Sequence, residues 1–171
     1  MMEKGLARLN ALPAAEARAE LLKCCGSSRW AEGVAAARPF RGGEELLETA
    51  DRVWWELSPE DWLEAFRGHP KIGGREAAAG VSEESRRWSE REQAGARDAP
   101  AETLAALAAG NRVYEEKFGF IFIVCATGKT AGEMLALLES RLNNARGAEL
   151  RVAAEEQRRI TRLRLRKLLE P

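Results

Sequence analysis

The sequence predicts an all-α protein: a single-domain orthogonal bundle of about seven or eight helices over residues 1–171, with little or no sheet. Apolar residues recur at three- and four-residue spacing along most of the chain, which is the period of an amphipathic helix. Capping residues and prolines open these stretches, and glycines close them. The one continuous apolar run has no second run with which to pair as a strand. The length and the 45% apolar composition suffice for one substantial core.

Four helices are expected in the first part of the chain, and they cover residues 13–25, 28–37, 46–57 and 59–66. Pro13 suits a first helical turn, and Gly26 ends the first of these helices. Ser27-Ser28 offers a cap for the second helix, which Arg38-Pro39 closes. Ser58-Pro59-Glu60-Asp61 combines a cap, a proline and acidic residues, which is a typical signal for the start of the fourth.

Four more helices are expected in the second part, and they cover residues 83–96, 100–114, 131–143 and 149–169. Ser82 caps the polar helix at 83–96, and residues 76–81 before it are expected to form a loop. Gly147 is expected to break the helix at 131–143. The run from Phe118 to Cys125 is apolar, aromatic and β-branched. Because it has no partner strand, an extended buried segment inside a helical protein is favoured.

Composition argues against several classes of function. The 27 basic and 27 acidic residues cancel, which gives no argument for binding nucleic acid or an anionic membrane surface. No apolar run approaches the ~20 residues that span a bilayer, and no signal segment is evident. Three cysteines without a CxxC pair and one histidine provide no plausible metal set and favour a reducing compartment. We therefore expect a cytoplasmic protein without a metal.

The single histidine lies on an unusual turn, Phe66-Arg67-Gly68-His69-Pro70-Lys71-Ile72-Gly73-Gly74. The proline pushes His69 out of the helical region, and the two glycines at the end permit a positive φ or a close approach of the backbone. A side chain on a stiff loop beside exposed amides is a common way of building a site. Most histidines do no chemistry, so an ordinary structural role is the alternative that this pattern leaves open.

A second candidate is the polar helix at 83–96. Ser89, Glu92 and Gln93 lie three or four residues apart and therefore share one helix face. Neighbouring alanine and glycine positions would let other groups come close to that face. The alternative is a solvated charged helix without a function of its own.

A third candidate is an arginine on the last helix. Arg164 falls in an apolar stripe with Gln157 and Ile160, whereas the neighbouring arginines point mostly elsewhere. A buried arginine needs an acidic partner or an anionic ligand, because an unpaired buried charge is very costly. Structural pairing and carboxylate binding are both open.

Six short motifs occur in order along nearly the whole chain. They are Arg38-Pro39-Phe40, Gly68-His69-Pro70-Lys71-Ile72-Gly73, Ser89-x-x-Glu92-Gln93-Ala94-Gly95, Asn111-x-x-Tyr114-x-x-Lys117-Phe118-Gly119-Phe120-x-Phe122-Ile123-Val124-Cys125, Arg141-Leu142-x-Asn144, and Glu149-Leu150 through Ile160-x-x-Leu163-Arg164-Leu165. Each is weak alone, but the ordered set is specific. With it the chain resembles the 2-oxo-4-hydroxy-4-carboxy-5-ureidoimidazoline (OHCU) decarboxylases of urate degradation.

The resemblance implies a helical, cofactor-free lyase that converts OHCU to (S)-allantoin. It places the family's catalytic histidine at His69 and the family's substrate-contacting Ser-x-x-Glu-Gln at Ser89, Glu92 and Gln93; our hypothesis makes Glu92 the second catalytic residue. The implied substrate-binding residues are Pro70, Ser89, Gln93, Phe122, Ile123, Val124, Cys125, Ala126 and Arg164, with Arg162 as the alternative arginine. Family members are commonly dimers, so a homodimer is one expectation, as is a functional link to urate oxidase and hydroxyisourate hydrolase.

A mechanism follows from these residues as a hypothesis. The substrate carries a carboxylate and a hydroxyl on one ring carbon, next to a C=N bond that can accept the electrons released with CO2. Glu92 is expected to take a hydrogen bond or a proton from the hydroxyl. His69 is expected to act as general acid–base, since a free imidazole has a pKa of about 6.5. Ser89, Gln93 and the 122–126 backbone would hold one face, so that one enantiomer forms.

Two other interpretations stay open. A related ureide or purine lyase acting on a different ring could use the same pocket. A non-enzymatic helical interaction module would explain the amphipathic helices, but neither a histidine on a Gly/Pro turn nor an arginine in an apolar stripe.

Overall fold

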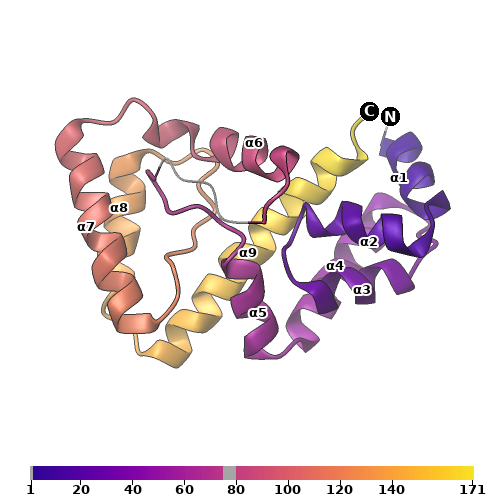
Figure 1. Ribbon diagram of the computed structural model, residues 1–171, viewed down its shortest axis with the longest axis horizontal. Helices are drawn as coiled ribbons and strands as arrows, with labels where there is room; N and C mark the ends of the chain where they lie inside the picture. Colours follow the sequence, from indigo (N-terminus) through magenta and orange to yellow (C-terminus); the bar gives the residue numbers. More distant parts are fainter. Residues whose placement is uncertain (1, 75–79) are drawn as a thin grey trace. The chain divides into compact units, whose positions relative to one another are not determined.

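The computed structural model describes residues 2–74 and 80–171, and within these ranges all regular structure is helical (Figure 1). The α-helices are α1 (Met2–Ala11), α2 (Ala14–Leu22), α3 (Ser28–Ala36), α4 (Gly43–Glu56), α5 (Pro59–Phe66), α6 (Glu83–Glu92), α7 (Ala101–Phe118), α8 (Ala131–Arg141) and α9 (Arg146–Leu169), with a short 3-10 helix, η1 (Ala94–Ala96). No strand occurs in the described ranges, so the all-α prediction is confirmed. None of the helices described there is both long enough and apolar enough to cross a membrane.

The nine α-helices in these ranges exceed the expected number because α1 was not predicted. Gly5 in its centre argues against a helix by propensity. The structure explains this glycine, since a Cβ at position 5 would lie 2.1 Å from the carbonyl oxygen of Leu169. Leu6 and Leu9 bury the apolar side of α1. Packing against α9 therefore outweighs the low propensity.

Several predicted boundaries were wrong, among them the end of α7, which extends to Phe118 instead of residue 114. Gly147 does not break α8, which ends at Arg141, but lies in the first turn of α9, where a Cβ would meet nothing within 4 Å. The polar helix stops at Glu92 and continues as η1 after Gln93. Ser27 and Ser82 cap their helices as expected, and Thr130 caps α8. Of the predicted loop at 76–81, residues 76–79 lie outside the described residues.

The chain divides into two compact units, of which the first comprises residues 2–65 and 158–171. In this unit α2 packs on α3, and α3 packs on α4 (Figure 1). Its core includes the fully buried rings of Trp30 and Trp54. The indole N–H of Trp30 donates to the carbonyl of Ala50 at 3.1 Å, which satisfies its polar atom inside the core. The prediction of one domain over residues 1–171 stays a prediction.

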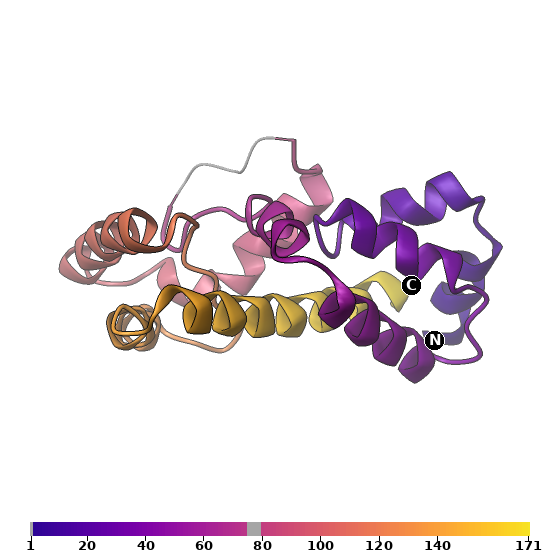
Figure 2. The ribbon, with the colours of Figure 1, turned by 90° about the horizontal axis from the view of Figure 1, so that it is seen from below.

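The second unit comprises the described part of residues 66–157. Its helices α7 and α8 lie side by side in both views (Figures 1 and 2). Gly110 allows this, because a Cβ there would lie 2.8 Å from the side chain of Leu138. Tyr114 and Phe118 of α7 contact the rings of Phe120 and Phe122, which forms an aromatic core.

The predicted extended segment is present in this unit. Gly119 ends α7 with a φ of 80°, and residues 121–126 follow without regular structure although they are mostly buried. Buried carbonyls without a strand partner need other donors. Arg141 donates to Ile123 O at 2.7 Å, and Lys129 donates to Cys125 O at 2.7 Å. Side chains thus replace the hydrogen bonds that a sheet would supply.

Candidate functional site

His69 lies on the turn that follows α5. Its backbone N–H donates to Phe66 O at 3.1 Å, and Pro70 then leads the chain away from the helix. A second tight turn follows, in which Gly74 N donates to Lys71 O at 2.9 Å. Gly73 adopts a φ of 75°, a left-handed conformation that favours glycine, as predicted. The backbone around the histidine is therefore held by local hydrogen bonds.

The imidazole of His69 contacts a residue far along the chain. Its Nε2 lies 2.6 Å from Oε1 of Gln157, which is in the part of α9 that belongs to the second unit. Gln157 is fully buried. A buried amide oxygen is costly unless it is hydrogen-bonded, so this contact both satisfies Oε1 of Gln157 and fixes one edge of the histidine ring.

The candidate face of α6 is buried and is not a solvated charged surface. Ser89 and Glu92 are only 5% and 8% exposed, and Trp88 of the same helix is also buried. Gln93 follows directly as the C-cap residue, and its Oε1 accepts a hydrogen bond from Gly73 N at 3.1 Å. This bond connects the end of α6 with the turn that carries His69.

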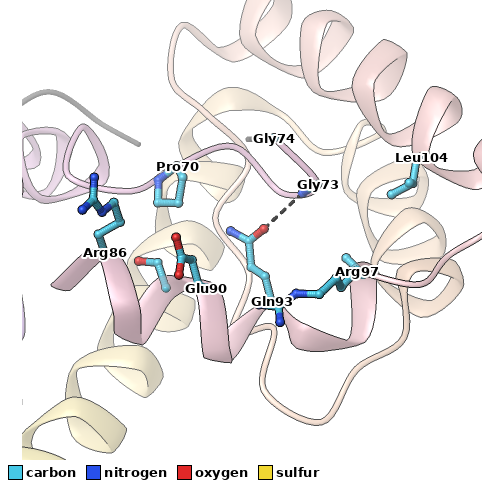
Figure 3. Close-up of a pocket in the computed structure, with 10 residues that line it drawn as sticks. Pro70, Gly73, Gly74, Arg86, Glu90, Gln93, Arg97 and Leu104 are labelled. Carbon is cyan, nitrogen blue, oxygen red and sulfur yellow. Dashed lines mark hydrogen bonds between the residues drawn. The ribbon is translucent and has the colours of Figure 1, made fainter. Parts of the chain in front are cut away.

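A pocket of about 260 Å³ lies between this turn, α6 and the start of α7 (Figure 3). Its lining residues are Pro70, Gly73, Gly74, Arg86, Ser89, Glu90, Gln93, Ala96, Arg97 and Leu104. Figure 3 shows the Gln93 side chain rising from the end of α6 toward Gly73. Three predicted site residues thus share one pocket, whereas His69 and Glu92 are not among its lining residues.

Segment 122–126 lies near Glu92 at the end of α6. Burial raises the pKa of the Cys125 thiol, the carboxylates of Glu156 and Glu92 raise it further, and the ammonium of Lys129 opposes them. Glu92 therefore lies close enough to Cys125 to affect its charge. The segment that was predicted to bind substrate is buried throughout, at Phe122, Ile123, Val124, Cys125 and Ala126. It lies beside the carboxylate of Glu92, a predicted catalytic residue of the same unit.

Gly95 makes possible the close approach of the backbone at Lys129 to the residues that follow α6. A Cβ at position 95 would lie 2.1 Å from the carbonyl oxygen of Lys129, a contact that only backbone movement could relieve. We expect Gly95→Ala to destabilise the protein by about 1–3 kcal/mol or more. Urea denaturation measures this change. Gly147→Ala is the matched control, because its Cβ meets nothing and alanine favours a helix; equal losses for both variants would contradict the account.

Arg164 and Arg162 both belong to the first unit. Arg164 is 4% exposed, as its place in the apolar stripe predicted. Burial raises the pKa of the nearby Cys25 thiol to about 12, while the Arg164 guanidinium acts to lower it. Arg162 donates to Asp51 Oδ2 at 2.7 Å, and Arg158 donates to the same oxygen at 2.9 Å. Arg162 thus has a structural ion pair within its own unit.

Sequence reasoning missed the partners of the site residues. Gln157 appeared in the apolar stripe of the last helix. A buried amide there indicates that it needs a hydrogen-bond partner, but the sequence does not identify that partner. Glu156 gave no signal, since it sits in a run of charged residues. In the described ranges no three His, Cys, Asp or Glu side chains are placed to hold a metal ion. What the residues described here can supply is acid–base chemistry and fixed hydrogen bonds.

Known proteins with similar sequences are described as OHCU decarboxylases or as uric acid degradation bifunctional proteins. Residues 10–166 match the family model described as OHCU decarboxylase. The uric acid degradation bifunctional protein TTL of Arabidopsis thaliana is 40% identical over 146 residues, which are 85% of this chain and 45% of that protein. The 2-oxo-4-hydroxy-4-carboxy-5-ureidoimidazoline decarboxylase of Haloferax volcanii is 30% identical over 139 residues, 81% of this chain and 80% of that protein. The chain therefore spans less than half of the Arabidopsis relative.

Solved structures agree with the sequence matches. The crystal structure of an OHCU decarboxylase in the presence of (S)-allantoin has a TM-score of 0.76 at 39% identity and covers 88% of this chain and 96% of its own. An (S)-allantoin synthase has a TM-score of 0.70 at 20% identity over 95% of this chain and 53% of its own, which shows a shared fold alone.

Proposed function

The chain belongs to the OHCU decarboxylase family, and on this premise we propose that it decarboxylates OHCU to (S)-allantoin in urate degradation. The observation that carries the proposal is the hydrogen bond from Gly73 N to Gln93 Oε1. It connects the histidine turn with the end of α6 inside one unit, and these two motifs are the ones on which the family resemblance places the catalytic groups.

The proposed mechanism assigns the proton transfers to His69 and Glu92. When the C–CO2 bond breaks, its electron pair forms a C=C bond with the neighbouring carbon, and the π pair of the C=N bond moves to the nitrogen, which takes up a proton from solvent. The hydroxyl proton passes to Glu92 as the new carbonyl forms. His69 then donates a proton to the adjacent ring carbon, so that one solvent proton is consumed overall. A carboxylate that accepts a proton and an imidazolium that donates one are the usual partners in general acid–base catalysis.

Hydrogen-bond donors and backbone are proposed to hold the substrate in place. Because Gln93 Oε1 faces Gly73, its amide N–H group is the end suited to a substrate oxygen. Ser89 and Pro70 lie in the same pocket. The 122–126 backbone is proposed to contact the ring from another side. Contacts fixed on several elements would leave one face open to protonation, which accounts for a single enantiomer.

The finer expectations are proposals that rest on the sequence and on the family resemblance. They are a single domain over residues 1–171, work without a cofactor, a homodimer, a cytoplasmic location, and a functional link to urate oxidase and hydroxyisourate hydrolase. Each can be tested separately from the reaction.

Arg164 is proposed as the substrate-side arginine, on its match to the family motif. Arg162, which pairs with Asp51, is the alternative. We expect Arg164→Lys to lower kcat/KM by about 10-fold or more, since a charged hydrogen bond contributes roughly 1.5–3 kcal/mol. Arg162→Lys should change kcat/KM by less than about threefold. Steady-state kinetics of both variants tests this choice. A larger loss in Arg162→Lys than in Arg164→Lys would make Arg162 the substrate-side arginine.

CO2 release from freshly prepared OHCU tests the proposed reaction. The expected result is a rate that rises in proportion to protein concentration. A protein that releases CO2 from another ureide but not from OHCU would support the related-lyase alternative. A protein that neither releases CO2 nor gains thermal stability from (S)-allantoin would support the interaction module, because a ligand that binds the native state must raise its melting temperature.

A further inference from the structure

The contact between His69 and Gln157 indicates which ring nitrogen of the histidine exchanges a proton with the substrate. We propose that Gln157 is a positioning residue, whose amide oxygen holds the neutral imidazole in the tautomer protonated at Nε2, so that Nδ1 is the nitrogen that exchanges a proton with the substrate. This inference rests on the proposed function and adds an atom-level assignment to it.

The geometry fixes the direction of the hydrogen bond. Nε2 of His69 lies 2.6 Å from Oε1 of Gln157. An amide oxygen can only accept, so the ring nitrogen that faces it carries the proton. In a neutral imidazole one nitrogen is a donor and the other an acceptor. Protonation at Nε2 therefore leaves the lone pair of the neutral ring on Nδ1.

Gln157 is held rigidly enough to impose this tautomer. It is fully buried and is part of the regular helix α9, whereas His69 lies on a turn. Side chains that support a functional group act most precisely when they project from a helix and are locked by packing. The more rigid partner thus sets the orientation of the less rigid one.

The neutrality of the amide also matters. A carboxylate at this position would orient the ring equally well, but it would add a negative charge beside the imidazole and favour the imidazolium. An amide fixes the ring without that charge. When the imidazolium gives its Nδ1 proton to the substrate carbon, the N–H electron pair stays on Nδ1 as the lone pair. The ring ends in the tautomer that Gln157 accepts, so the hydrogen bond at Nε2 persists throughout.

Imidazole ¹⁵N NMR of the wild-type protein tests the assignment without any mutation. His69 is the one histidine of the sequence, so both ring nitrogens can be identified without ambiguity. Above the titration of the ring we expect a protonated signal from Nε2 and an unprotonated signal from Nδ1. The opposite pattern would overturn the proposal, whether or not the protein decarboxylates OHCU.

The variant Gln157→Met tests the positioning role. It removes the acceptor at nearly constant volume, so we expect a mixture of tautomers and a loss of kcat of about 10- to 100-fold, the range typical of groups that orient functional histidines. KM should change by less than threefold.

Gln157→Glu keeps the acceptor and should restore the Nε2–H tautomer. Leu150→Ala, which leaves a cavity elsewhere in the same helix, controls for lost stability and should change neither the tautomer nor kcat.

The outcomes separate the two proposals. Unchanged tautomer and unchanged kcat in Gln157→Met would overturn the positioning role. A wild-type protein with the Nε2–H tautomer but no decarboxylation would overturn the proposed function and leave the positioning of the ring supported.

Discussion

His69→Asn is expected to lower the rate of OHCU decarboxylation by about 10²–10⁴-fold, the range that general acid–base catalysis contributes. Asparagine preserves a polar side chain on the turn but cannot take up or release a proton near neutral pH. Any remaining product should form with proton delivery from water and lose optical activity. CO2 release measures the rate, and circular dichroism of the product measures its handedness.

Arg67→Ala is the matched control for this variant. Arg67 lies on the same turn, and its side chain is exposed. It should retain the rate within about twofold. Both variants should unfold at urea concentrations near that of the wild type, since neither removes a core side chain. Stereospecific turnover by His69→Asn at the wild-type rate would contradict the assignment of the histidine.

Arg141→Met should have the largest effect on stability, because it breaks a buried ion pair. Arg141 Nε donates to Glu149 Oε1 at 2.7 Å, and the two side chains are 8% and 0% exposed. The phenol of Tyr114 donates to the same carboxylate; burial and this negative charge raise the pKa of the phenol. Removing one partner of a buried pair typically costs about 3–5 kcal/mol. The Ile123 carbonyl would also lose its donor.

Urea denaturation followed by far-ultraviolet circular dichroism measures this loss. The double variant Arg141→Met/Glu149→Gln should be more stable than Arg141→Met, because it removes the uncompensated charge and keeps an acceptor for Tyr114. A double-mutant cycle isolates the pair from its surroundings. A loss below about 1 kcal/mol for Arg141→Met would show that the pair is not important for stability.

The helices with start signals in the chain were predictable because those signals are local. Ser27, Ser82 and Thr130 each accept a hydrogen bond from a backbone N–H three residues later, so the sequence alone identifies them. Helix α1 was not predictable, since its glycine is explained by the backbone of Leu169 at the far end of the chain. Helix propensity describes each residue by itself and therefore does not include a contact with a distant part of the chain.

The family was also predictable and is confirmed, whereas the roles of the candidate residues stay predictions. Ordered motifs carry that information even where each is short. The partner of His69 was not predictable, because Gln157 is 88 residues away and no spacing rule connects a turn with a distant helix. The burial of Glu92 was hidden for a similar reason. The residues that cover its helix face come from other elements, so the local sequence looked solvated.

The optical activity of allantoin formed from fresh OHCU tests the central claim most directly. OHCU generated in the cuvette decays by itself to racemic product, which gives no circular dichroism. With the protein present, we predict a rapid signal of (S)-allantoin whose initial rate is proportional to protein concentration. A racemic product formed at the spontaneous rate, from protein that is folded by far-ultraviolet circular dichroism, would contradict the claim that this chain is a stereospecific OHCU decarboxylase.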